Sequence, residues 1–298
     1  MSTFPTKVLL ATDGSEEAEL ATGTAVDLVK VGASELHVLH VGPGLPLYEL
    51  PDYPAHFEEV VAAQRREAQR ILDDQVKKVE ALGATGVAAH LEMDERPDRA
   101  IVELGEELGL GLVVMGSRGL GVMRRTLMGS VSDSVVRHAH CPVMIARWKP
   151  VVFPAKILLA TDASEEAHLA AATAADLAQR TGSQVHVAHV GAELTHGAFP
   201  AVQVGPLPGV HQDELDRQAK GLLEAETERM KSSGTEVGGS HLRRGRADKE
   251  IVLLAEEEGA DLIVMGSRGL GGIGQALMGS VSDSVVRHAH CPVMVVRS

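Results

Sequence analysis

Cysteine is scarce in this sequence, with two residues among 298. Cys141 and Cys291 each stand directly before a proline, at matching places in two similar stretches. Small domains that depend on disulfides carry many more cysteines, so this pair favours buried thiols over a disulfide framework. We therefore expect both cysteines to be free.

Long apolar runs are also absent, because no run reaches the roughly 18 residues that a membrane-spanning helix needs. The opening MSTFPTKVLLATDG has no basic segment followed by an apolar core and a cleavage site. Acidic residues outnumber basic ones by 41 to 28, and the resulting net charge of −13 repels nucleic acid at long range. We expect a soluble, cytoplasmic protein with neither membrane nor nucleic acid as a partner.

A long internal repeat dominates what the sequence does contain. LMGSVSDSVVRHAHCPVM at 127–144 recurs unchanged at 277–294, and VMGSRGLG at 114–121 recurs at 264–271. KVLLATDGSEEAEL, which starts at Lys7, returns as KILLATDASEEAHL. A period this long is a domain rather than a solenoid unit.

The repeat predicts two domains, at 1–149 and 150–298, joined near WKPVVFP. Within one copy, short apolar runs alternate with helical patterns, which predicts an α/β fold with a parallel sheet covered on both faces. The expected strands of the first copy are 7–11, 35–41, 87–93, 112–115 and 142–146, and the expected helices are 16–31, 56–82, one from Pro97, and 130–138.

A glycine-rich turn follows the fourth expected strand of each copy. Gly116 and Gly119 are followed after nine residues by Gly129 and Ser130, where a helix is expected to begin. Glycine lets backbone N–H groups approach an anion closely, and a helix N-terminus adds unpaired donors and a positive dipole end. This order of elements favours a phosphate cradle over glycines that serve only as turns.

The spacing Gly, two residues, Gly, nine residues, Gly-Ser resembles the nucleotide-binding signature of ATP-binding universal stress proteins, in both halves. The resemblance implies two tandem five-stranded, doubly wound Rossmann-like domains of the adenine nucleotide alpha hydrolase-like type, with strand order 3-2-1-4-5. It also implies one ATP per domain across the carboxyl ends of strands 1 and 4, and a regulatory or stress-tolerance role.

The same resemblance assigns the nucleotide-contacting residues. In the first half they are Ala11, Thr12, Asp13, Val41, Met115, Gly116, Arg118, Gly119, Gly129, Ser130, Val131 and Ser132. In the second half they are Ala160, Thr161, Asp162, Val190, Met265, Gly266, Arg268, Gly269, Gly279, Ser280, Val281 and Ser282.

The two aspartates of these sets would lie close to a polyanion, which is repulsive unless they meet the ribose hydroxyls or a bridging cation. We therefore expect Mg²⁺ or Mn²⁺ with the triphosphate near Asp13 and Asp162. The alternative is that each aspartate caps an Asx-type turn. Ala163 stands where the first copy has Gly14, which matters only if that turn needs a positive φ.

Aromatic residues make up only 2% of the chain, so adenine is expected in an aliphatic slot beside Val41 or Val190 rather than stacked on a ring. Arg124 and Arg125 lie between the glycines of the first cradle, where the second has Gly274 and Gln275. We hypothesise that these guanidiniums make ATP binding tighter in the first half.

Other patterns carry less weight. GLGGIG in the second copy matches a dinucleotide fingerprint by letter, yet it does not open a helix and no acidic residue follows at the required distance. The HAHC runs could suggest zinc, but no second ligand cluster is evident. We interpret His37, His40, His186 and His189 as core or rim histidines.

Three functions remain open: a nucleotide-binding regulatory module, a slow Mg-dependent ATP hydrolase, and an interaction scaffold without nucleotide. The first is favoured because a cradle is present while no nucleophile and base can be assigned. The apolar last strands would be unpaired edges, so we expect them to join the two halves as an intramolecular pseudo-dimer. A further homodimer of whole chains is left open.

Overall fold

The computed structural model describes residues 4–44, 57–93, 96–119, 128–147, 153–191, 212–269 and 278–297. The first half contains β1 (Lys7–Thr12), α1 (Glu16–Gly32), β2 (Glu35–Gly42), α2 (Phe57–Ala81), β3 (Ala88–Met93), α3 (Pro97–Leu108), β4 (Leu112–Gly116), α4 (Ser130–His138) and β5 (Val143–Ala146). The second half contains β6 (Lys156–Ala160), α5 (Glu165–Thr181), β7 (Gln184–Gly191), α6 (Gln212–Ser232), β8 (Val237–Arg244), α7 (Ala247–Glu258), β9 (Leu262–Gly266), α8 (Ser280–His288) and β10 (Val293–Val296).

The boundaries of these elements follow local chemistry. The hydroxyl of Ser15 accepts the N–H of Ala18 and caps α1, and Ser164 caps α5 through Ala167 in the same way. Each strand expected in the first half is present to within one residue at either end. The helix expected to end at 82 ends at Ala81, so Leu82 lies beyond α2, and it is exposed.

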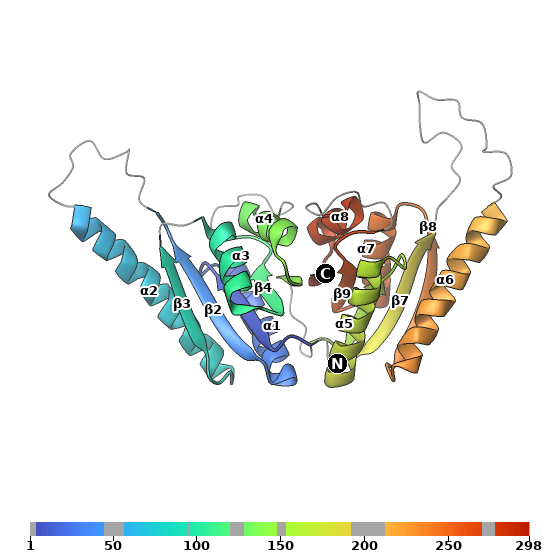
Figure 1. Cartoon of the computed structure of the whole chain (residues 1–298), viewed down its shortest axis with the longest axis horizontal. Helices are drawn as coiled ribbons and strands as arrows, with labels where there is room; N and C mark the ends of the chain where they lie inside the picture. The colour runs from blue at the N-terminus through green and yellow to red at the C-terminus, as the bar shows by residue number, and fades with distance from the viewer. Residues whose placement is uncertain are drawn as a thin grey trace, which may run out of the picture.

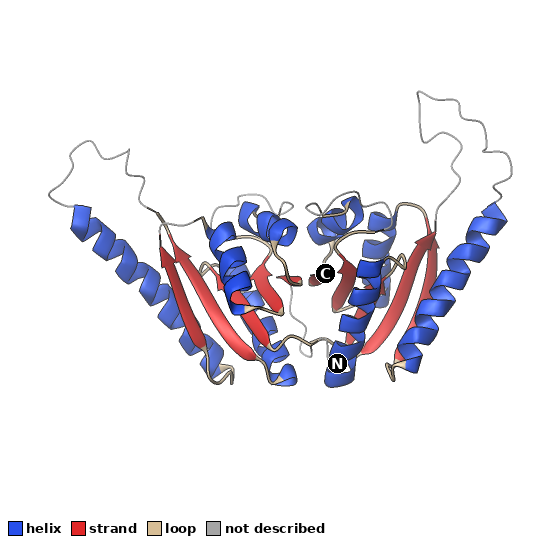
Figure 2. Cartoon of the chain, in the orientation of Figure 1, coloured by secondary structure: helices blue, strands red, loops and turns tan. Residues whose placement is uncertain are grey.

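The ten strands form one sheet in the order β3-β2-β1-β4-β5-β10-β9-β6-β7-β8. Each half therefore has the expected order 3-2-1-4-5 with parallel neighbours, and the halves meet where β5 pairs antiparallel with β10. Figures 1 and 2 show the two halves as near mirror images in outline, with α2 and α6 at the outer ends and α4 beside α8 at the centre.

Alternation along the strands divides the interior into two apolar layers. Leu10 and Val114 belong to the layer that also contains residues of α1, α2, α5 and α6, whereas their strand neighbours Leu9 and Val113 belong to the layer that contains residues of α3, α4, α7 and α8. Each layer runs through both halves, and most of its members are less than 5% exposed. The seam between the halves is therefore part of the hydrophobic core.

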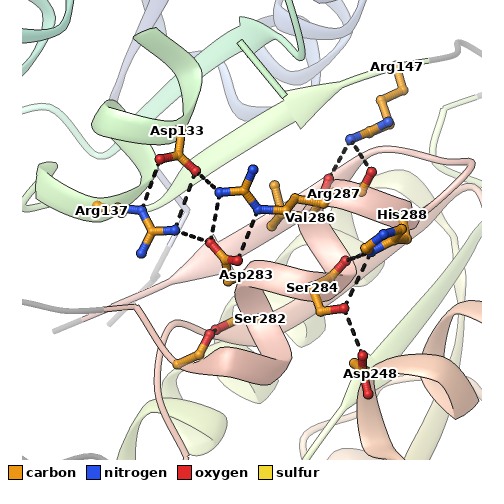
Figure 3. A network of polar contacts seen from close by, with 11 residues as sticks. Asp133, Arg137, Arg147, Asp248, Ser282, Asp283, Ser284, Val286, Arg287 and His288 are labelled. Atoms are coloured by element: carbon orange, nitrogen blue, oxygen red, sulfur yellow. Dashed lines mark hydrogen bonds and ion pairs between the residues drawn. The ribbon is translucent and has the colours of Figure 1, made fainter. Parts of the chain in front are cut away.

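Polar contacts also cross this seam. The expected pairing of the last strands places Met144 opposite Met294. Arg147, which follows β5, donates to the carbonyl oxygens of Val286 (2.5 Å) and Arg287 (3.1 Å) at the end of α8, as Figure 3 shows. These carbonyls have no partner within their own helix, so an arginine of one half caps a helix of the other.

A ring of four charges lies between α4 and α8 (Figure 3). Arg137 pairs with Asp133 on its own helix (3.1 Å) and with Asp283 on the other, while Arg287 pairs with Asp283 (3.0 Å) and with Asp133. Each charge thus has two partners of opposite sign. The arrangement is reciprocal, as an approximate two-fold axis requires.

The cysteines are free, as expected. Burial raises the pKa of Cys141 to about 11 and that of Cys291 to about 12, so both thiols stay protonated and unreactive at neutral pH. Among the helices within the described residues, none is long and apolar enough to cross a membrane.

A histidine pair links the two outer strands of the first half and makes stability depend on pH. His37 Nδ1 lies 3.0 Å from His90 Nε2, and burial lowers the pKa of both imidazoles from 6.5. Below pH 6.5 the unfolded chain therefore binds protons at these histidines more readily than the folded chain does. The contribution of the pair to the free energy of unfolding is complete above pH 6.5 and is lost as the pH falls below it. We expect the free energy of unfolding to drop between pH 7.5 and pH 5.

Urea unfolding in the presence of a chelator checks this, with His37→Gln as the comparison. The variant should show a smaller drop over the same pH range than the original chain. An equal drop in both proteins would assign the pH dependence to other groups.

Candidate functional site

Each half has one cavity at the carboxyl ends of its central strands. The cavity of the first half has a volume of about 340 Å³ and that of the second about 400 Å³, within the range of about 300–1,000 Å³ of small-molecule sites. Every residue that the sequence assigned to nucleotide contact lines one of them. The structure thus brings both predicted sets together, and their role in binding stays a prediction.

The glycines of the first cradle lie where side chains would collide with neighbouring groups. A Cβ on Gly116 would lie 2.9 Å from the backbone carbonyl of Glu17, and a Cβ on Gly119 would lie 2.2 Å from Asp13 Oδ2. In the second half, a Cβ on Gly266 would lie 2.9 Å from the backbone of Glu166, and a Cβ on Gly269 would lie 2.2 Å from Asp162 Oδ2. These positions allow the glycine turn to pack directly against the β1 and β6 turns.

The glycine turn is joined to the start of the following helix. The N–H of Gly129 donates to the carbonyl of Ser117 (2.9 Å), and the N–H of Gly279 donates to that of Ser267 (2.8 Å). Each turn therefore lies beside the first turn of α4 or α8. The residues between them, 120–127 and 270–277, lie outside the described residues, as do Arg124, Arg125, Gly274 and Gln275.

The N-termini of α4 and α8 have glycine at the N-cap and no side-chain cap. The first backbone bond of α4 runs from the N–H of Asp133 to the carbonyl of Gly129 (2.9 Å), so the N–H groups of Ser130, Val131 and Ser132 precede the intrahelical ladder. This contrasts with α1 and α5, which are capped by serines. The open helix ends can offer amide donors and a positive dipole end to an anion.

Two of the polar side chains assigned to nucleotide contact already form hydrogen bonds within the protein. The buried hydroxyl of Ser132 donates to the carbonyl of Gly116 (2.9 Å), and that of Ser282 donates to the carbonyl of Ser267 (2.6 Å). These hydroxyls therefore tie the helix to the glycine turn. The hydroxyl proton of Ser132 is directed to the backbone rather than to a phosphate, whereas Ser130 is exposed at the helix mouth.

The cradle arginines pair with glutamates of the neighbouring helix. Arg118 Nη2 lies 2.7 Å from Glu17 Oε1, and Glu17 Oε2 is buried without a partner among the described residues. In the second half Glu166 accepts from the Ser267 hydroxyl (2.5 Å), and from the N–H (2.6 Å) and Nε (2.8 Å) of Arg268. The second glycine turn is therefore held by more bonds than the first.

Asp13 and Asp162 form the Asx turns that were the alternative to a metal role. Asp13 Oδ1 accepts the N–H of Ser15 (3.0 Å), and Asp162 Oδ1 accepts that of Ser164 (3.1 Å). Both carboxylates also line their cavities. The turn role is therefore present, and it leaves each carboxylate at the rim of the cradle.

Ala163 has a φ of 60° at the place where Gly14 has 78°. The turn does need a positive φ, so the alanine of the second half is held in a conformation that glycine adopts more easily. The N–H of Ala163 donates to the Thr161 hydroxyl (3.2 Å), as Gly14 does to Thr12, so both turns keep the same geometry.

Apolar residues complete each cavity, and the sequence analysis missed several of them. In the first half Leu39 from β2 and Ile101 from α3 line the cavity together with Val41 and Met115. The residues not anticipated are Ala18, Leu39, Pro97 and Ile101 in the first half, and Ala167, Ala188, His189, Ala247 and Ile251 in the second. The i, i+4 spacing at the start of the third helix of each copy was a signal for Pro97 with Ile101 and for Ala247 with Ile251.

Comparison with known proteins gives a family for both halves. A family model described as the universal stress protein family matches residues 5–147 and again 155–297. The chain belongs to the universal stress protein family. "Universal stress protein Rv2005c" of Mycobacterium tuberculosis is 31% identical over 303 residues, covering 97% of this chain and 96% of that protein.

Other members resemble it over the same length. A universal stress protein of Mycolicibacterium smegmatis is 29% identical and covers 97% of this chain and 96% of its own. The crystal structure of a universal stress protein from Archaeoglobus fulgidus aligns with a TM-score of 0.69 and 28% identity, covering 98% of this chain and 96% of that one. The tandem arrangement is thus shared with other universal stress proteins.

Proposed function

We propose that this universal stress protein binds one ATP molecule in each half, as a regulatory module rather than an efficient enzyme. The main support is the contrast between capped and uncapped helices. Ser15 and Ser164 close the N-termini of α1 and α5, whereas α4 and α8 have no side-chain cap and open next to a glycine turn. The helices α3 and α7 also lack a side-chain cap, and the hydrogen bonds from Gly129 and Gly279 to the glycine turns set α4 and α8 apart from them. Amides arranged in this way suit phosphate oxygens.

The adenine ring has an aliphatic place in each cavity. Leu39, Val41, Ile101 and Met115 line the first cavity, and Ala188, Val190, Ile251 and Met265 line the second. Such side chains bury the faces of a purine without stacking, which gives modest rather than very tight binding.

Charge balance favours a divalent cation with the triphosphate. The described cradle arginines already pair with Glu17 and Glu166, and Asp13 and Asp162 add negative charge at the rim. A bound Mg²⁺ would offset the charge of the phosphates beside these carboxylates. Asp13 Oδ1 and Asp162 Oδ1 accept backbone N–H groups of their own turns, so we do not assign either carboxylate as the base of an efficient hydrolase.

Freshly purified protein tests this proposal when it is denatured and the released nucleotide and metal are identified by mass spectrometry. We expect an adenine nucleotide, and titration calorimetry of nucleotide-free protein with ATP should give two sites that weaken when EDTA removes Mg²⁺. If no nucleotide is released and the titration with ATP produces no binding heat, the result would exclude nucleotide binding and support the interaction scaffold. Stoichiometric phosphate release in a single turnover would instead support the hydrolase.

A further inference from the structure

Two histidines and a glutamate of the second half gather away from the nucleotide cradle. His186 Nδ1 lies 3.0 Å from His241 Nε2 and 3.3 Å from Glu258 Oε2, and His241 Nδ1 lies 3.7 Å from Glu258 Oε1. His186 is the third residue of β7, His241 belongs to β8, and Glu258 ends α7. They therefore join the two outermost strands to the helix that covers them.

The arrangement suits a metal ion. One ligand atom from each residue lies within 4.8 Å of the others, and no other such group of three occurs within the described parts of the chain. In a tetrahedral zinc site with bonds of about 2.0–2.2 Å, ligand atoms are about 3.3 Å apart. Two imidazoles and one carboxylate are a donor set that zinc uses, with a further position for water.

Two glycines of β8 let both imidazoles lie directly against its backbone. A Cβ on Gly239 would lie 2.7 Å from His241 Nε2 and 3.0 Å from His186 Nδ1, and a Cβ on Gly238 would lie 2.7 Å from His186 Nε2. The pairing of β7 with β8 shifts register at this point, between Val185 and His186. The two glycines at this strand irregularity thus clear of any Cβ the space that the imidazoles occupy, and Gly239 does so beside the two nitrogens that face each other.

The first half provides a built-in comparison. His37 and His90 are placed 3.0 Å apart in the same way, but Ala88 is the register partner of His37 where Gly239 is that of His186. The last residue of α3 is Leu108, where α7 ends with Glu258. The first half therefore has the histidine pair without a carboxylate at the helix end and without the glycine register partner. Its nearby Glu35 lies 3.7 Å from His37 Nε2, the nitrogen that does not face His90.

We propose that His186, His241 and Glu258 bind a divalent transition-metal ion of the Zn²⁺ type, one per chain, in the second half only. The ion would clamp the edge strand β8 to β7 and α7. Side chains exposed by 8% for His186, 19% for His241 and 28% for Glu258 place the site just beneath the surface, where an ion can enter. Lys156 lies near, and its Nζ donates to the backbone carbonyl of Glu258 (2.6 Å) rather than to its carboxylate.

This site is separate from the nucleotide cradle. The cradle lies at the carboxyl ends of the strands and at the start of α7, where Ala247 lines the cavity. Glu258 is at the other end of that helix, eleven residues further along. A failure to detect ATP binding would therefore not contradict the metal proposal, and a failure to detect Zn²⁺ binding would not contradict the ATP proposal.

Calorimetric titration of the chelator-treated full chain with ZnCl₂, without nucleotide, tests the proposal. We expect one ion per chain, together with a rise in the thermal unfolding midpoint when Zn²⁺ is added. Glu258→Leu should weaken binding at least about tenfold and abolish the rise. The variant is expected to fold, because leucine occupies the matching position at Leu108. Gly239→Val should block the site by filling the cleared space.

Two control variants separate this site from surface binding. Glu256→Gln removes the carboxylate that faces His290 at 3.8 Å on the surface, and His37→Gln disrupts the histidine pair of the first half. Both variants should bind Zn²⁺ with the stoichiometry and affinity of the original chain. The proposal is overturned if the chain binds no Zn²⁺, or if Glu258→Leu and Gly239→Val bind it as the original chain does.

Discussion

Substitution of Gly119 by valine should abolish ATP binding in the first half, and Gly269→Val should do the same in the second. A Cβ at either position would lie 2.2 Å from an oxygen of Asp13 or Asp162, so the larger side chain must displace the glycine turn from the β1 or β6 turn. The affinity should fall about a hundredfold or more, because the amides no longer converge on one phosphate position. The fold should persist, since both residues lie in loops.

Calorimetry with Mg-ATP measures this outcome as a stoichiometry. Two sites per chain should become one in either single variant and none in the double variant, with circular dichroism unchanged. Gly221→Val is the matched control, because a Cβ there meets nothing within 4 Å and the residue is exposed on α6. Two intact sites in the double variant would show that the nucleotide binds elsewhere.

The single variants also test the hypothesis about the arginines of the first loop. Only the first site remains in Gly269→Val, and only the second remains in Gly119→Val. If Arg124 and Arg125 contact phosphate, the first site binds ATP more tightly than the second. Equal affinities, or a tighter second site, would remove that hypothesis without affecting the cradle itself.

The strands and helices were predictable because each has a local signal. The buried strands read as apolar runs, Ser15 and Pro97 mark helix starts, and the glycine spacing marks the cradle, so these elements appear at or within a residue of their expected bounds. The repeat strengthened every one of these predictions, since two copies of a pattern agree. Strand order and the pairing of the last strands came from the family resemblance and from edge-strand physics, and both are present.

The contacts that were missed join residues far apart in the chain. Nothing in the sequence shows that the N–H of Phe4 donates to Asp176 of the second half (2.8 Å), or that Ser132 donates to the backbone of Gly116. The sequence analysis interpreted His186 as a core or rim histidine because its neighbours His241 and Glu258 lie 55 and 72 positions later. Side-chain direction depends on packing that composition and periodicity do not encode.

Loss of the two seam arginines should destabilise the protein more than any surface change. Arg147 donates two bonds to carbonyls at the end of α8, and Arg297 donates to Val136 (2.5 Å) and Ala139 (2.6 Å) at the end of α4. Burial lowers the pKa of both guanidiniums, yet each remains charged at neutral pH. Hydrogen bonds to a charged group contribute about 1.5–3 kcal/mol, and bonds made by one guanidinium are not additive. With one such contribution counted for each arginine, Arg147→Met with Arg297→Met should lower the free energy of unfolding by about 3–6 kcal/mol.

Urea unfolding followed by circular dichroism measures that loss, and Arg65→Met provides the control because Arg65 is exposed on α2. The control should change the free energy of unfolding by less than about 0.5 kcal/mol. If the double variant behaves like the control, the carbonyls of α4 and α8 are satisfied by water and the seam is held by its apolar layers alone. If it unfolds in two steps instead of one, the arginines are what couple the halves, because each guanidinium of one half caps a helix that begins beside the glycine turn of the other.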